Sequence, residues 1–216
     1  RVGGLEHELP ARMEQAEQQH VGSTVDVEVV EHGVDPLDRR VDPIKVLGLG
    51  NDVHRDWETA VAAFSKVEGI ELTIVSSKAK PSLAFGTDNV RVTRVSSNND
   101  LRMLFEEASI LIVPLKQNMH ASGITVVQEG ALLGLPSVAT DVGGLRAYFG
   151  DECVTYVPEG DPKALREAVL ALSADRERAF RQATAARARM GRHGLGADSY
   201  VDRHIEISRQ LLGQAG

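Results

Sequence analysis

The clearest indication of the fold lies in residues 120–144, which read His120-Ala-Ser-Gly-Ile-Thr-Val-Val-Gln-Glu-Gly-Ala-Leu-Leu-Gly-Leu-Pro-Ser-Val-Ala-Thr-Asp-Val-Gly-Gly144. An apolar run typical of a buried strand, Ile110-Leu-Ile-Val-Pro114, precedes them. The quoted residues contain a loop, then a helix that carries Glu129, then a second buried strand from Pro136 to Thr140. A strand, a helix and another strand in this order indicate a parallel β-α-β unit.

The same alternation extends over most of the chain and predicts the fold class. From Ile44 onward, strand and helix patterns follow one another with short connections. We expect an α/β fold, a doubly wound parallel sheet of about six strands that is Rossmann-like. The expected strands cover residues 45–50, 71–76, 90–95, 110–113, 136–140 and 154–157, and the other expected helices cover 56–67, 101–108 (capped by Asn98 or Asn99), 144–149 and 162–172.

Three regions are expected along the chain. Residues 1–42 would form an N-terminal helix (Leu5–His20), a strand (Val25–Val30) and an interdomain linker. Residues 43–173 would form the Rossmann-like domain, which binds its ligand beyond the carboxyl ends of the strands. Residues 174–216 would form packing and crossover helices, broken at residues 191–196 and ending in a helix at 200–212.

Composition narrows the classes of function. A formal net charge of −7 argues against a nucleic-acid partner. The single cysteine, Cys153, fits a reducing compartment, so we expect a cytoplasmic protein. The seven histidines show no ligand spacing with cysteines or acids, so no metal is expected. Because the chain begins with Arg1 rather than Met, it is expected to be a fragment of a longer protein.

The loop before the helix that carries Glu129 is a candidate anion site. The first N–H groups of a helix lack partners within it, so a helix that starts beyond a parallel strand favours phosphate. Ser122, Gly123, Ile124 and Thr125 occupy that position. Gly123 permits close approach of a ligand to the backbone, and the carboxylate of Glu129 suits a vicinal diol. A phosphate and a ribose together indicate a nucleotide.

A second candidate phosphate contact follows the first expected strand. Leu47-Gly-Leu-Gly50 leads into a turn in which Arg55 places a permanent cation near the start of the next helix. The dinucleotide-binding fingerprint of dehydrogenases needs a third glycine, which is absent here. Ser76-Ser-Lys78 also stands where a dehydrogenase carries its ribose-binding acid. A dehydrogenase is therefore disfavoured, and a P-loop ATPase is disfavoured because its glycine-lysine motif is missing.

Residues 129–144 resemble the donor-site signature of retaining GT-B glycosyltransferases. In that family a glutamate is followed at this spacing by Ala-Met-Ala, by Gly-x-Pro-Val-Val-Ala-Thr and by Gly-Gly. The likeness also includes Gly33-Val-Asp35, the turn at 50–57, residues 101–114 and the helix start at 161–165, so that it spans roughly residues 25–175.

The resemblance implies a donor site and an activity. Glu129 would bind the ribose of a nucleoside diphosphate sugar, and Arg55 and Asn51 would face the diphosphate together with the backbone of residues 122–125. Arg55 and Glu129 would be the catalytic residues, with the sugar nucleotide as substrate and no cofactor. The reaction would transfer a hexose with retention to an acceptor hydroxyl, as in polysaccharide or glycoconjugate synthesis. The partner would be a missing N-terminal GT-B domain. Any peripheral contact with the inner face of the membrane would be made through that domain.

Two positions depart from the family pattern. Ala121 stands where the family commonly has a second glutamate that contacts the donor sugar, and Asn51 stands where it has an arginine. The neighbouring His120 is the candidate for the missing sugar contact, and Arg55 is left as the main cation.

Simpler interpretations and other functions remain open at this stage. Glu129 could be a solvated helix residue, Arg55 could pair with Asp52 or Glu58, and His54 and His120 could be ordinary loop histidines. The chain could also be a stand-alone nucleotide-sugar-binding module or a GT-B nucleotide-sugar epimerase, which would use acids and histidines in its cleft.

Overall fold

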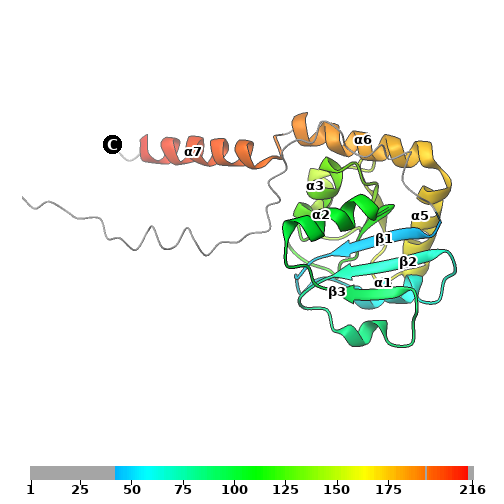
Figure 1. Ribbon diagram of the computed structural model, residues 1–216. Helices are drawn as coiled ribbons and strands as arrows, with labels where there is room; N and C mark the ends of the chain where they lie inside the picture. Colours follow the sequence, from blue (N-terminus) through cyan, green and yellow to red (C-terminus); the bar gives the residue numbers. More distant parts are fainter. Residues whose placement is uncertain (1–41, 193, 214–216) are drawn as a thin grey trace, which may run out of the picture. The chain divides into compact units, whose positions relative to one another are not determined.

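Strands and helices alternate through residues 42–192 and 194–213, the part of the chain that this computed structural model describes (Figure 1). The expected helix Leu5–His20, the strand Val25–Val30 and Gly33-Val-Asp35 lie outside the described residues. The strands are β1 (Ile44–Leu49), β2 (Ile70–Val75), β3 (Val90–Thr93), β4 (Ile110–Val113), β5 (Ser137–Thr140) and β6 (Thr155–Val157). The helices are α1 (Trp57–Phe64), η2 (Pro81–Ala84), α2 (Asn98–Glu107), α3 (Ile124–Leu132), α4 (Leu145–Tyr148), α5 (Pro162–Ala174), α6 (Arg176–Arg192) and α7 (Ala197–Gly213).

The described strands form one six-stranded sheet in the order β3-β2-β1-β4-β5-β6. Every neighbouring pair is parallel, with Ile44 opposite Ile70 between β1 and β2, and Val46 opposite Ile110 between β1 and β4. The predicted doubly wound α/β fold is therefore confirmed. The order reverses between β1 and β4, and ligands bind beyond the carboxyl ends of the strands at such a switch point.

Helices cover both faces of the sheet (Figure 1). On one face α1 and α5 pack together over a core that includes Phe64, Ile74, Ile112 and Val169, all buried. On the other face lie α2, α3 and α6, and α3 packs against α6. The apolar runs of the central strands are buried on both sides, as parallel sheets require.

Local sequence sets the helix starts. Asp56 caps α1 by accepting from Thr59 N, and Asp161 caps α5 ahead of Pro162, as predicted for that proline. The prediction for α2 was wrong by a few residues. The helix begins at Asn98 rather than Leu101, because the cap is the side chain of Ser97, which accepts from Asp100 N, and not Asn98 or Asn99.

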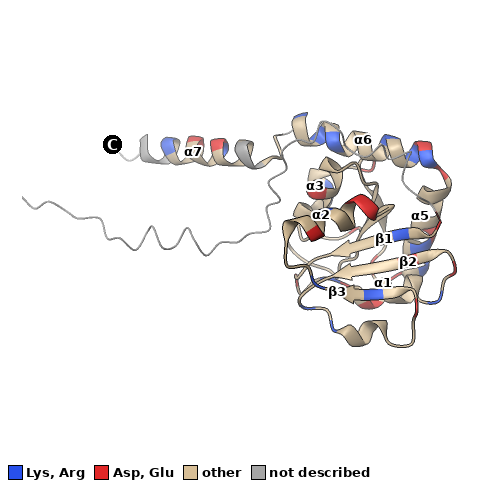
Figure 2. Cartoon of the chain, viewed as in Figure 1, with Lys and Arg blue, Asp and Glu red and all other residues tan. Residues whose placement is uncertain are grey.

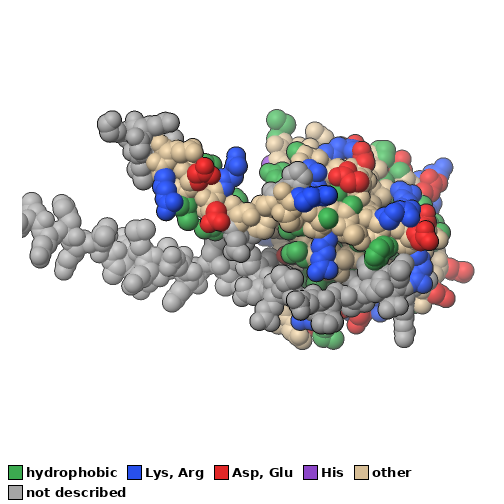
Figure 3. Space-filling view, turned by 90° about the horizontal axis from the view of Figure 1, so that it is seen from above, with side chains coloured by type: hydrophobic (Ala, Val, Ile, Leu, Met, Phe, Trp, Pro, Cys, Tyr) green, Lys and Arg blue, Asp and Glu red, His purple; other side chains and the backbone are tan. Residues whose placement is uncertain are grey.

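The last two helices match the predicted arginine-rich helix, break and final helix. Basic residues recur along α6, and acidic and basic side chains are interspersed on the face seen in Figure 3 (Figures 2 and 3). Buried Gln182 joins α6 to the sheet, because its Oε1 accepts from Ser137 N at 2.9 Å and its Nε2 donates to Thr155 Oγ1 at 2.8 Å. Among the described residues, none of the helices combines the length and apolar character that crossing a bilayer requires.

Candidate functional site

Two loops meet at the switch point of the sheet. One follows β1 and the other follows β4, and backbone hydrogen bonds join them. Asp56 N donates to Pro114 O at 3.0 Å, and Lys116 N donates to His54 O at 2.7 Å. Leu115 N also donates to Thr140 Oγ1 at 3.0 Å, which ties the second loop to the end of β5. These hydrogen bonds hold the backbones of both loops beside the ends of the strands.

Arg55 occupies the centre of this junction and is only 6% exposed. Its guanidinium lies against the backbone of Gly50 and Gly123. A Cβ at Gly50 would collide with Arg55 Nε, and a Cβ at Gly123 would lie 2.8 Å from Arg55 Nη1. Both glycines also have positive φ angles, +142° and +84°, which side chains disfavour. The glycine of each loop thus makes room for the same cation.

The guanidinium is buried without adequate hydrogen bonding. Within the described residues, Arg55 Nε and Nη1 are buried and have no hydrogen-bond partner. Burial lowers the pKa of Arg55 to about 10, although the nearby charge of Asp52 opposes this shift. An unpaired buried donor costs about 1–3 kcal/mol, and more when it is charged. A bound anion would remove that cost, so the arrangement indicates an anion site.

The start of α3 adjoins this cation. Gly123 is the N-cap residue and has no side chain with which to cap the first N–H groups of the helix. Ile124 N already donates to Ala121 O at 3.2 Å, and the hydroxyl of buried Ser122 donates to Asp52. Of the four predicted contacts at 122–125, Ser122 and Ile124 are thus partly engaged within the protein, while Thr125 is exposed.

Glu129 lies further along α3 and is partly buried. Burial raises the pKa of its carboxyl group to about 7. Partial burial distinguishes Glu129 from a fully solvated helix residue. A carboxyl group that is this poorly hydrated gains from hydroxyl donors, such as those of a vicinal diol.

Asn51, another predicted diphosphate contact, is exposed and anchors a neighbouring loop. Its Oδ1 accepts from Ser77 N at 2.6 Å and from Ser77 Oγ at 2.9 Å, just after β2. The carbonyl oxygen of Asn51 is therefore occupied, and its amide NH₂ is the group with which it would reach a phosphate. Its predicted contact with the diphosphate stays a prediction.

Asp52 is a site residue that sequence reasoning did not assign. Its carboxylate accepts from His54 N at 2.9 Å and Ser122 Oγ at 2.7 Å, and contacts His54 Nδ1 at 2.8 Å and His120 Nε2 at 3.4 Å. Burial alone would raise the pKa of Asp52, but these hydrogen bonds outweigh burial and hold it far below its ordinary value. Asp52 thus connects both loops, and it would be ionised at neutral pH.

The Gly143-Gly144 pair fixes the position of His120. Gly144 N donates to His120 O at 3.3 Å, while a Cβ at Gly143 would lie 2.5 Å from Asn118 Oδ1. The same Asn118 Oδ1 accepts from His120 N at 3.2 Å. The two glycines are therefore more than a turn before α4, since they let the loop after β5 pack against the loop that carries His120.

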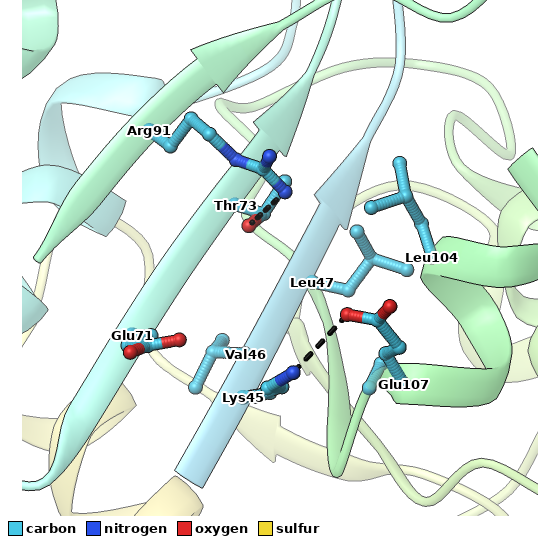
Figure 4. Close-up of a pocket in the computed structure, with 9 residues that line it drawn as sticks. Lys45, Val46, Leu47, Glu71, Thr73, Arg91, Leu104 and Glu107 are labelled. Carbon is cyan, nitrogen blue, oxygen red and sulfur yellow. Dashed lines mark hydrogen bonds and ion pairs between the residues drawn. The ribbon is translucent and has the colours of Figure 1, made fainter. Parts of the chain in front are cut away.

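A separate hollow lies on the face of the sheet beside α2 (Figure 4). Three of its charged side chains contact residues of the hollow itself: Lys45 Nζ lies 3.1 Å from Glu107 Oε2, and Arg91 Nη2 donates to Thr73 Oγ1 at 3.4 Å. None of the predicted site residues lines this hollow. The junction around Arg55 is the better candidate for a functional site.

Comparisons with known proteins identify a family and support the fold. The family model described as Glycosyl transferases group 1 matches residues 45–175. Sucrose-phosphate synthase from Thermosynechococcus elongatus is similar in structure at a TM-score of 0.69 and 22% identity, over 86% of this chain and 49% of that one. A glycosyltransferase from Rickettsia africae is similar at a TM-score of 0.65 and 16% identity, over 78% of this chain and 48% of that one. Anabaena HepE in complex with UDP-glucose is similar at a TM-score of 0.59 and 13% identity, over 69% of this chain and 44% of that one.

The chain thus spans about half the length of these solved structures. At such identities the structural likeness supports the fold. No curated protein sequence matches the chain.

Proposed function

Because the chain belongs to the group 1 glycosyl transferases, we propose that it binds a nucleoside diphosphate sugar and is the donor-binding, C-terminal half of a retaining GT-B enzyme. The main support is the buried guanidinium of Arg55 beside the start of α3, because its Nε and Nη1 have no hydrogen-bond partner within the described part of the chain. HepE, which shares the fold, is described in complex with UDP-glucose, and we extend that class of ligand to this chain.

Arg55 and α3 would act on the leaving group. In the transfer, the bond between the anomeric carbon and the diphosphate oxygen breaks, and negative charge accumulates on the diphosphate. A fixed guanidinium and the positive end of a helix stabilise that charge without reorganising during the reaction. The carboxylate of Glu129 would accept hydrogen bonds from the ribose and orient the donor.

The acceptor belongs to the other half of the proposed enzyme. An N-terminal domain would bring the acceptor hydroxyl to the anomeric carbon, and any contact with the inner face of a membrane would be made through that half. Polysaccharide or glycoconjugate synthesis in the cytoplasm is the setting that we propose. Donor binding, rather than turnover, is what this chain alone should display.

Calorimetric titration with a series of phosphates tests donor binding. We expect nucleoside diphosphates to bind at least about tenfold more tightly than the matching monophosphates, because a second phosphate adds a charge-assisted contact worth about 1.5–3 kcal/mol. Inorganic phosphate should bind weakest, because it lacks the ribose. Equal affinity for mono- and diphosphates, or no binding of either, would contradict the proposal.

One observation favours a second candidate, a nucleotide-sugar epimerase. Asp52, His54 and His120 place an acid and two histidines beside the donor site, as an epimerase would need. Incubation of a nucleotide sugar without acceptor separates the two reactions. An epimerase yields a new nucleotide sugar, whereas a transferase leaves the donor intact or hydrolyses it slowly.

A further inference from the structure

Three potential metal ligands lie together beside Arg55. Each of Asp52, His54 and His120 offers one ligand atom, and these atoms all lie within 4.8 Å of one another. The residues come from the two loops that meet at the switch point. We propose that Asp52, His54 and His120 bind one divalent transition-metal ion, and that Zn²⁺ suits them best, although the sequence alone predicted no metal.

The donor set supports a transition metal. Two imidazole nitrogens and one carboxylate oxygen suit Zn²⁺ and its neighbours, whereas Mg²⁺ and Ca²⁺ prefer oxygen alone. Three protein ligands with a fourth position open are typical of zinc sites that also bind water or substrate. The side chain of His120 is 56% exposed, so solvent or a ligand can reach the cluster.

The distances between ligand atoms fit a common metal ion. With metal–ligand bonds of about 2.0–2.2 Å, neighbouring ligands of a tetrahedral site lie ~3.3 Å apart. His54 Nδ1 lies 2.8 Å from Asp52 Oδ1, and His120 Nε2 lies 3.4 Å from Asp52 Oδ2, so each imidazole nitrogen lies near that spacing from one carboxylate oxygen. The two rings meet edge to face with centroids 5.0 Å apart, and the ligand atoms of all three residues lie within 4.8 Å of one another.

The surroundings hold the ligands in place. The backbone of His54 is fixed by Lys116 N, and that of His120 by Asn118 and Gly144. Ser122 Oγ donates to Asp52 Oδ2 at 2.7 Å, as an outer residue does when it orients a metal-bound carboxylate. The positive charge of Arg55 opposes a cation here, so we expect moderate affinity, in the micromolar range.

Titration with Zn²⁺ alone, in competition with a chromophoric chelator, tests the site. We expect the wild type to bind one ion at this site and His120→Ala or Asp52→Asn to weaken that binding at least about tenfold. His204→Ala, which removes an exposed histidine of α7, should leave it unchanged. Far-ultraviolet circular dichroism and thermal melts of the metal-free variants check that each is folded.

Co²⁺ gives a second reading of the same site. Four-coordinate Co²⁺ bound by nitrogen and oxygen shows intense visible absorption, which should appear with the wild type and disappear with His120→Ala. Zn²⁺ binding that is equal in the wild type and both variants, or no binding in the micromolar range, would overturn the proposal. Neither titration contains a nucleotide, so their outcome is independent of donor binding.

Discussion

Arg55 illustrates how a residue that lowers the stability of the ligand-free protein can indicate a binding function. A buried cation with two nitrogens that have no hydrogen-bond partner among the described residues destabilises the free protein. Gly50 and Gly123 both leave room for it, so the site is shaped around the charge. Residues held against stability in this way are expected where a ligand supplies the missing partner.

Replacing Arg55 with Met should separate stability from binding. We expect the free energy of unfolding of the ligand-free variant to equal or exceed that of the wild type by about 1–2 kcal/mol, because unpaired donors are removed. Nucleoside diphosphate affinity should fall at least about tenfold, because a charged hydrogen bond is lost. Denaturant unfolding and calorimetry measure the two effects.

Arg102→Met is the matched control for this change. Arg102 is exposed on α2 and pairs with Glu106 at 2.7 Å, so its loss should alter neither quantity appreciably. An Arg55→Met variant that is several kcal/mol less stable and binds nucleotide normally would show that Arg55 is structural.

Glu129 should make stability depend on pH in a specific window. Its folded-state pKa of about 7 lies above the ordinary value of 4.5, so the folded protein holds more protons than the unfolded chain between these values. The contribution of Glu129 to stability is therefore present below about pH 4.5 and is lost as the pH rises to about 7. Relative to the wild type, Glu129→Gln should gain roughly 2–3 kcal/mol between pH 4.5 and 8, measured by urea unfolding. A difference that does not vary with pH would contradict the raised pKa.

At the scale of elements, the β4–α3 connection shows how a loop forms a site. β4 ends beside β1, the loop is tied to the β1–α1 loop and to β5, and the helix starts at a glycine that faces Arg55. The strand pattern, the helix and the importance of Gly123 were predictable, because each depends on neighbouring residues. The contact between Gly123 and Arg55 was not, because it depends on how two distant loops pack.

Gly123→Ala tests the contribution of this close packing. A Cβ there would collide with Val113 Cγ1 and crowd Arg55 Nη1, in addition to the strain of a φ of +84°. We expect Gly123→Ala to cost about 1–3 kcal/mol more than Gly69→Ala in unfolding experiments. Gly69 has a similar φ of +73°, and no atom of the described residues lies within 4 Å of a Cβ built there, so Gly69→Ala reports the backbone strain alone. Equal costs would show that the space beside Arg55 is not tightly filled.

At the scale of the whole molecule, the sequence predicted the fold better than the site. Apolar runs and turn residues located the six strands of the described chain, because the core selects for them locally. The order of the strands was not predicted, because it depends on how distant segments of the chain pair. Arg55, Glu129 and the start of α3 were singled out from turn and helix-start chemistry, and the resemblance to a known family added their proposed roles.

The cluster of Asp52, His54 and His120 was missed for a physical reason. His120 lies 68 positions from Asp52, and the two meet only because β1 and β4 are adjacent and Asn118 and Gly144 fix the intervening loop. Linear spacing between metal ligands is informative when they share one element. Here the arrangement comes from the topology of the sheet.

A crystal structure of the protein with a bound nucleoside diphosphate tests the proposed donor site most directly. We expect diphosphate oxygens about 2.7–3.2 Å from Arg55 Nη1 and from backbone N–H groups in the first turn of α3, with the ribose hydroxyls on Glu129. A diphosphate bound elsewhere, with Arg55 Nε and Nη1 still unpaired between Gly50 and Gly123, would contradict this assignment.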